Sequence, residues 1–217
     1  MKTHPTPNPE LRDYVEREIL PRYRDFDRAH NLDHVHAVIA RSLALAADYA
    51  VNPDMVYAIA AYHDTGLVHG RENHHLDAGR ILEADAELRR WFREEEIRTM
   101  REAVEDHRAS SSHAPRSIYG RIVAEADRQI DPATIIRRTI QYGLAHYPEL
   151  DREGHYARCL EHLSEKYAEG GYLQLWIAES ENARQLEALR RIIRNPEELR
   201  RRFDATFDSE QHVPTKD

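Results

Sequence analysis

The fold of this chain is decided by the segment MVYAIAAYHDTG, residues 55–66. Its first eight residues are apolar on every side of a helix, which is typical of a helix enclosed by other helices. Thr65-Gly66 ends the segment, and glycine readily takes the left-handed conformation that closes a helix. The segment therefore predicts a central core helix that ends in the pair His63-Asp64.

The chain on either side of this segment also predicts helices. Apolar residues recur at a spacing of three and four, and no alternating strand pattern competes with them. Asn52-Pro53 is expected to end one helix and to begin the core helix. The other helices are expected at about residues 9–20, 33–50, 73–84, 94–107, 117–128, 132–141, 151–168, 173–194 and 196–207.

The length of 217 residues is enough for one substantial core, so we expect an all-α, single-domain bundle of many helices. Residues 107–115 and Gly170-Gly171 are breaks, but both are too short to be domain linkers. The expected organisation has four parts: residues 1–27 as an N-terminal helical extension, 28–130 as the core, 131–207 as helices packed on that core, and 208–217 as a disordered tail.

Composition excludes several functions. The formal net charge of −8 argues against nucleic acid as a partner, because binding to phosphate backbones needs a cationic surface. A single cysteine, Cys159, excludes both a disulfide framework and a thiolate zinc site. No stretch approaches the roughly 20 apolar residues that span a bilayer. We therefore expect a cytoplasmic protein without membrane contact.

Two aspartates predict a metal site. Asp64 and Asp127 each end an apolar helix, where the helix dipole is negative and a buried carboxylate needs a compensating cation. Arg128 or Arg71 is one alternative source of that charge. The sequence also holds 14 histidines, six of them between residues 63 and 113, and histidine is the commonest neutral metal ligand. These features favour one shared metal ion.

The order of these residues resembles a known family. His34 in Leu-Asp-His-Val, then His63-Asp64, then Asp127 in Ala-Glu-Ala-Asp-Arg, is similar to the H…HD…D signature of the HD superfamily of metal-dependent phosphohydrolases. The resemblance covers roughly residues 28–130. It implies an HD-domain helical fold and His34, His63, Asp64 and Asp127 as ligands of a divalent Mn, Fe, Co, Ni or Mg ion.

A second layer resembles the two-metal members of the family, including HD-GYP-like domains. His75 in His-Leu-Asp-Ala-Gly looks like one further ligand, His107 like the next, and His113 is a third candidate. Asp64 would then bridge two ions. Leu67 stands where HD-GYP domains have lysine, and no Gly-Tyr-Pro follows His107, so hydrolysis of a cyclic dinucleotide is not inferred.

The resemblance implies hydrolysis of a small phosphate ester or anhydride, perhaps of a nucleotide, with Asp64 holding the attacking water and His69 and His74 as acid/base candidates. Candidate phosphate-binding residues flank the ligands: Arg71, Arg108, Arg116 and Arg121. A small phosphorylated substrate is the expected partner, and the sequence leaves undecided whether the chain forms a homodimer. Two alternatives remain: a di-iron HD-type oxygenase, and a catalytically inactive module that binds metal or nucleotide.

Overall fold

The computed structural model describes residues 6–27, 30–109, 111 and 113–211. Within these ranges the chain forms α-helices and short 3-10 helices and no strand, which confirms the predicted all-α class. The last helix, α10, spans Pro196–Gln211. Part of the predicted disordered tail, 208–211, is therefore helical, because Phe207 is buried and anchors this last stretch of the helix. Residues 212–217 lie outside the described residues.

The chain divides into two compact units, Met1–Arg128 and Gln129–Asp217. This division differs from the expected single domain. The boundary falls in a short stretch between two helices that contains neither glycine nor serine, so no linker composition marks it. The contact expected between residues 131–207 and the core stays a prediction.

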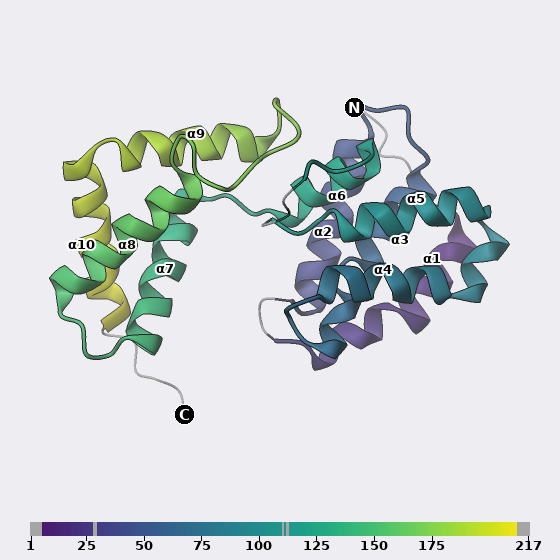
Figure 1. The fold of residues 1–217 in the computed structure, drawn as a ribbon, viewed down its shortest axis with the longest axis horizontal. Helices are drawn as coiled ribbons and strands as arrows, with labels where there is room; N and C mark the ends of the chain where they lie inside the picture. Colours follow the sequence, from purple (N-terminus) through teal and green to yellow (C-terminus); the bar gives the residue numbers. More distant parts are fainter. Residues whose placement is uncertain (1–5, 28–29, 110, 112, 212–217) are drawn as a thin grey trace. The chain divides into compact units, whose positions relative to one another are not determined.

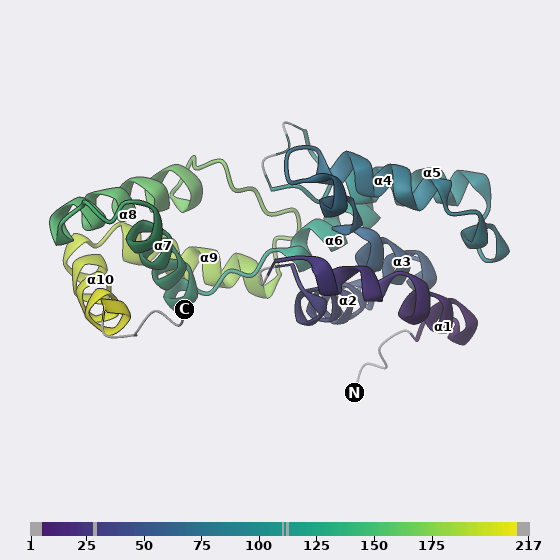
Figure 2. The same ribbon diagram turned by 90° about the horizontal axis from the view of Figure 1, so that it is seen from below.

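The first unit packs six α-helices around one apolar core (Figure 1). They are α1 (Pro9–Glu18), α2 (Leu32–Ala46), α3 (Pro53–Tyr62), α4 (His74–Ala84), α5 (Glu94–Glu105) and α6 (Ile118–Asp127). Helix α3 is the central one, because all its residues from Met55 to Tyr62 are buried. It contacts α1, α2, α4, α5 and α6, while α4 and α5 lie side by side (Figure 2). Buried residues of α1 belong to the same core.

The helices of this unit begin where side-chain caps replace missing backbone partners. Asn31 accepts a hydrogen bond from the backbone N–H of His34 at 3.1 Å, and Asn52 accepts one from Asp54 at 2.9 Å. Ser117 caps α6 in the same way. Each cap satisfies an N–H group that a helix leaves unpaired at its first turn. The caps therefore fix where α2 and α6, which carry site residues, begin.

Gly66 has a different role from the expected one. The only glycines with positive φ among the described residues are Gly70 and Gly170, so Gly66 does not close α3 by a left-handed turn. It lies in the 3-10 helix η2 (Thr65–His69), directly against the backbone of α4. A Cβ at this position would lie only 2.5 Å from the backbone nitrogen of Ala78. Gly66 is therefore required for close packing of η2 on α4.

The second unit contains α7 (Pro132–His146), α8 (Arg152–Tyr167), α9 (Glu181–Ile193) and α10. Helix α7 contacts the other three. Helix α9 begins eight residues later than expected, because Ser180 accepts a hydrogen bond from the backbone of Ala183 and caps it there. The segment before it, 173–180, is not helical, although Leu173 and Ile177 are buried. The spacing of apolar residues in this segment therefore reflects their burial and not a helix.

No helix in the described part of the chain has the length and apolar character needed to cross a membrane.

Candidate metal centre

The candidate site of the first unit is built from the ends of five helices. His34 lies in the first turn of α2, and His74 is the first residue of α4. His63 follows the last residue of α3, His107 follows α5 by two residues, and Asp127 ends α6. The carbonyl ends of α3, α5 and α6 carry the negative pole of each helix dipole, which stabilises a cation. Helix ends thus bring distant segments of the chain to one place.

One cluster consists of His34, His63 and Asp127. The Nε2 atoms of His34 and His63 are 3.1 Å apart, and Asp127 Oδ1 lies 3.3 Å from the first and 3.7 Å from the second. The side chain of His63 is fully buried, whereas that of Asp127 is one-quarter exposed at 25%. This cluster is therefore open to solvent on the side of Asp127.

A second cluster consists of Asp64, His74 and His107. Asp64 Oδ1 lies 3.7 Å from His74 Nε2 and 3.5 Å from His107 Nε2. The other oxygen of the same carboxylate, Oδ2, lies 3.4 Å from His34 Nε2 and 3.1 Å from His63 Nε2. Asp64 therefore presents one oxygen to each cluster, and its side chain is only 4% exposed.

Three of the histidines are oriented by the same hydrogen bond. The Nδ1 atoms of His63, His74 and His107 contact the carbonyl oxygen three residues earlier in the chain, at 2.7, 2.8 and 2.6 Å. A carbonyl oxygen only accepts, so each Nδ1 carries the proton and donates it. The neutral ring then has its lone pair on Nε2, the atom that faces the clusters, and such backbone contacts commonly orient metal-binding histidines.

The charges of the two clusters stabilise one another. Burial would raise the pKa of Asp127, but the hydrogen bond with His34 and the charges of His63 and His107 outweigh it and lower that pKa to about 2. The pKa of Asp64 is lowered in the same way, against its burial, by His63, His107 and His34. Both carboxylates are therefore ionised at neutral pH, and His34, whose pKa their hydrogen bonds raise to about 9, supplies compensating positive charge.

The donor set fits divalent metal ions. Ligand atoms about 2.1 Å from one ion lie roughly 3.0–3.4 Å from one another. The separations in the first cluster, 3.1 to 3.7 Å, are close to this range. The expected arginine alternative has no support from the contacts of Arg71, which pairs with Asp27 and His30. Arg128 donates to the carbonyl of Ala124, and its charge lies close enough to Asp127 for the two to attract each other.

Other predicted site residues lie elsewhere. His75 is adjacent to His74 but is in neither cluster, because neighbouring residues on a helix project about 100° apart. His113 is exposed, and its Nδ1 contacts the carbonyl of Ala114 at 3.0 Å. His69 is 62% exposed and lies 3.8 Å from Asp77. The geometry thus brings His74 to the position that the sequence analysis assigned to His75.

The four candidate arginines differ in their surroundings. Arg108 lies near enough that its charge lowers the pKa of His74, after burial and His107. Arg71 is exposed, and its Nη2 is 3.2 Å from His30 Nε2. Arg121 is exposed on α6. Arg116 is held by Asp106, at 3.0 Å from its Nε, and by Glu105, at 2.8 Å from its Nη2. Arg116 is therefore engaged within the protein.

Replacing Arg116 with alanine is expected to destabilise the first unit by about 2 kcal/mol, because Asp106 would remain buried without its charged partner. Its partial exposure moderates the loss. Arg98→Ala, an exposed position on α5, is the control and should change stability by less than about 0.5 kcal/mol. Urea unfolding measures both. An unchanged midpoint for Arg116→Ala with weakened substrate binding would instead restore its predicted role as a phosphate ligand.

Sequence reasoning missed Tyr23, which lies beneath the site and is fully buried. Its hydroxyl donates to the carbonyl of Ala61 at 2.9 Å and accepts from the backbone N–H of Asp64 at 3.2 Å. These bonds hold the backbone where α3 ends, and so position His63 and Asp64. No local pattern around Tyr23 indicates this role, since the contact spans 41 residues.

Fold and site together define an all-helical protein with a histidine- and aspartate-lined candidate centre for divalent metal. Residues 31–129 match the family model of the HD domain. This match supports an HD domain in the first unit, and the HD superfamily consists mostly of metal-dependent phosphohydrolases. The match ends within one residue of the boundary of the first unit, so most of the second lies outside it. Comparison with curated proteins and with solved structures gave no significant match.

Proposed function

We propose that the first unit is a two-metal phosphohydrolase that acts on a small phosphate ester or anhydride. The observation that carries this proposal is the carboxylate of Asp64, which presents one oxygen to each cluster. Paired ions about 3.5–4 Å apart are common in enzymes of phosphoryl transfer. A bridging carboxylate between two sets of histidine ligands suits such a pair.

His34, His63 and Asp127 would hold one ion, His74 and His107 the other, and Asp64 both. Four imidazoles and two carboxylates, without a thiolate, suit Mn, Fe, Co or Ni better than Mg. When bound, the ions would lower the pKa of a water molecule and offset negative charge on the phosphoryl oxygens. The chain's own contribution is orientation, since backbone carbonyls fix His63, His74 and His107.

Arg108 is the side chain best placed to hold the substrate phosphate. It follows His107 directly, and its Nη1 donates to the carbonyl of Glu72 at 2.6 Å. This bond ties the guanidinium to the segment that precedes α4, on the side of His74. A guanidinium group can form paired hydrogen bonds with phosphate oxygens. His69 is exposed and precedes His74 in the sequence by a few residues, and it stays a candidate for the acid/base residue.

The reaction class is tested by exchanging the metal. Metal-free protein reconstituted without oxygen with Mn²⁺, Co²⁺ or Mg²⁺ is expected to release phosphate from a nucleotide or sugar phosphate in a substrate panel. Arg108→Gln should raise KM by roughly tenfold, because a hydrogen bond to a charged group contributes about 1.5–3 kcal/mol. Activity that requires iron and consumes oxygen would support an oxygenase. Metal binding without turnover would support a binding module.

Metal binding is expected to displace protons. Burial would lower the pKa of His34, but its hydrogen bonds with Asp127 and Asp64 raise that pKa to about 9. At pH 7 the ring is therefore protonated in the metal-free protein and must lose its proton to coordinate. We expect release of at least about one proton per chain, and affinity that increases with pH up to about 9.

Calorimetric titration with Mn²⁺ in two buffers of different ionisation enthalpy measures this release. His36→Gln serves as the control, because His36 lies on the same helix and is exposed. Metal binding at pH 7 without proton release would exclude His34 as a ligand.

A further inference from the structure

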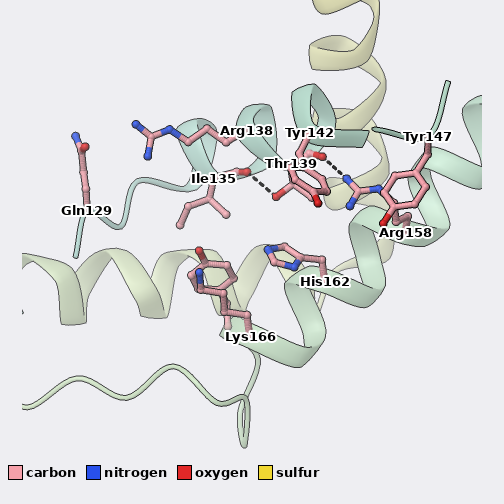
Figure 3. Close-up of a pocket in the computed structure, with 10 residues that line it drawn as sticks. Gln129, Ile135, Arg138, Thr139, Tyr142, Tyr147, Arg158, His162 and Lys166 are labelled. Carbon is pink, nitrogen blue, oxygen red and sulfur yellow. Dashed lines mark hydrogen bonds between the residues drawn. The ribbon is translucent and has the colours of Figure 1, made fainter. Parts of the chain in front are cut away.

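The second unit contains a pocket of its own, between α7 and α8, with a volume of about 540 Å³ (Figure 3). Helix α7 contributes Arg138 and Tyr142 to its lining, Tyr147 follows that helix, and α8 contributes Arg158 and Lys166. Pockets of roughly 300–1,000 Å³ are the usual size for small-molecule sites. All lining residues belong to the second unit, so neither the metal clusters nor the proposed phosphohydrolase activity bears on what this pocket binds.

The charged residues that line this pocket are basic. It is lined by the basic residues Arg138, Arg158 and Lys166, and none of the ten lining residues is acidic. Most other arginines of the unit lie against carboxylates, as Arg137 does at 3.5 Å from Glu210. Within the described residues, neither Arg138 nor Arg158 has a carboxylate within 4 Å. The pocket therefore lacks anions of its own in a chain whose net charge is −8.

The guanidinium of Arg158 is held in place, but one of its hydrogen-bond donors has no partner. Its Nη2 donates to the carbonyl of Thr139, and its guanidinium lies 5.6 Å from the ring centre of Tyr142 and 5.5 Å from that of Tyr147. Its Nε is buried and has no hydrogen-bond partner. Buried donors are nearly always paired in folded proteins, and an unpaired one calls for an explanation. This Nε atom lies against Gly143 of α7, so the guanidinium is enclosed on that side and its position at the pocket is fixed.

Aromatic surface lies beside this charge. Tyr142 is 52% exposed and Tyr147 is 39% exposed, while Tyr167 closes the base of the pocket at 9%. Figure 3 shows Arg158 between the rings of Tyr142 and Tyr147, and His162 reaching from α8 toward α7. Exposed tyrosine rings beside the fixed guanidinium of Arg158 suit a ligand that has both a planar ring and a negative group.

We propose that this pocket binds a small organic phosphate that carries an aromatic ring, such as a nucleoside monophosphate. The phosphate would accept hydrogen bonds from Arg138 and Arg158, with Lys166 adding positive charge, and the ring would lie against Tyr142 and Tyr147. A phosphate has up to two negative charges on a compact group, which matches a lining with three basic residues and no acidic one better than a single carboxylate does.

Calorimetric titration of the metal-free, full-length protein with AMP tests this assignment. We expect one AMP per chain, and an affinity about tenfold lower for Arg138→Gln, equivalent to one lost charged hydrogen bond. Arg137→Gln is the matched control. Arg137 precedes Arg138 in α7 and lies outside the pocket, so its replacement removes the same charge from a neighbouring position. Arg138 is exposed, so its replacement should leave the fold intact.

Two further probes separate the parts of the ligand. Ribose 5-phosphate should bind more weakly than AMP, because it lacks the ring, and Tyr142→Ala should remove that difference. Stronger binding of citrate than of AMP would overturn the assignment to a phosphate. Equal affinities in Arg138→Gln and Arg137→Gln, or absence of AMP binding, would overturn the proposal. AMP binding that is lost in Asp64→Asn but kept in Arg138→Gln would place the ligand in the first unit instead.

Discussion

Asp64→Asn is expected to remove both ions from the metal-loaded protein. Each oxygen of this carboxylate faces a different cluster, so a neutral amide weakens both at once. Each ion present at 1,000 times its Kd contributes about 4 kcal/mol to stability, so the loss of both should lower Tm by roughly 20 °C. Metal content by mass spectrometry and Tm by calorimetry measure the two effects. The loss of phosphohydrolase activity should be complete.

Asp33→Asn is the matched control for this experiment. Asp33 is the exposed neighbour of His34, and the substitution makes the same change of charge one residue from a ligand. We expect two ions per chain and an unchanged Tm within a few degrees. Two ions retained in Asp64→Asn would contradict the bridging arrangement.

The adjacent histidines of α4 give a sharper comparison within the same centre. His74→Ala should leave one ion per chain, because His74 Nε2 lies 3.3 Å from His107 Nε2 in the second cluster. His75→Ala should keep both ions. The reverse result would restore the assignment of His75 as the ligand.

Gly66→Ala is expected to destabilise the first unit by at least about 3 kcal/mol, as overpacking against atoms that cannot rotate away does. The added Cβ would overlap the carbonyl oxygen of His74 and approach the backbone nitrogen of Ala78 to 2.5 Å. Relief requires a shift of α4 itself, and this shift would move His74 out of the second cluster. Calorimetry should therefore show a lower Tm, and metal analysis one ion fewer per chain.

Gly154→Ala provides the control for Gly66→Ala. Its Cβ would meet only side-chain atoms, at 3.1 Å from Leu150 and 3.4 Å from Asp151, and these have rotational freedom. Alanine is also favoured over glycine within a helix by up to about 1 kcal/mol. A stability change within about 1 kcal/mol is expected. Similar Tm values for the two variants would show that α4 can move away from a side chain at position 66 with little loss of stability.

The sequence by itself determined the helical class and much of the site. Residues 55–62 are apolar on all sides, which only an enclosed helix explains, and the structure confirms the all-α fold. The order of His34, His63-Asp64 and Asp127 pointed to the HD superfamily before any contact was known. Hydrophobic period and caps are properties of neighbouring residues, and the order of a motif is read along the chain, so none of these features requires knowledge of tertiary contacts.

Tertiary structure alone decided the rest. Arg116 pairs with Asp106 across a loop, and the boundary between the two compact units falls in a stretch that no linker composition marks. Sequence reasoning could not distinguish His74 from His75, since they are the first two residues of one helix and project about 100° apart. In the structure it is His74 that lies with Asp64 and His107, on a helix whose backbone packs against Gly66, a residue in another element of the chain.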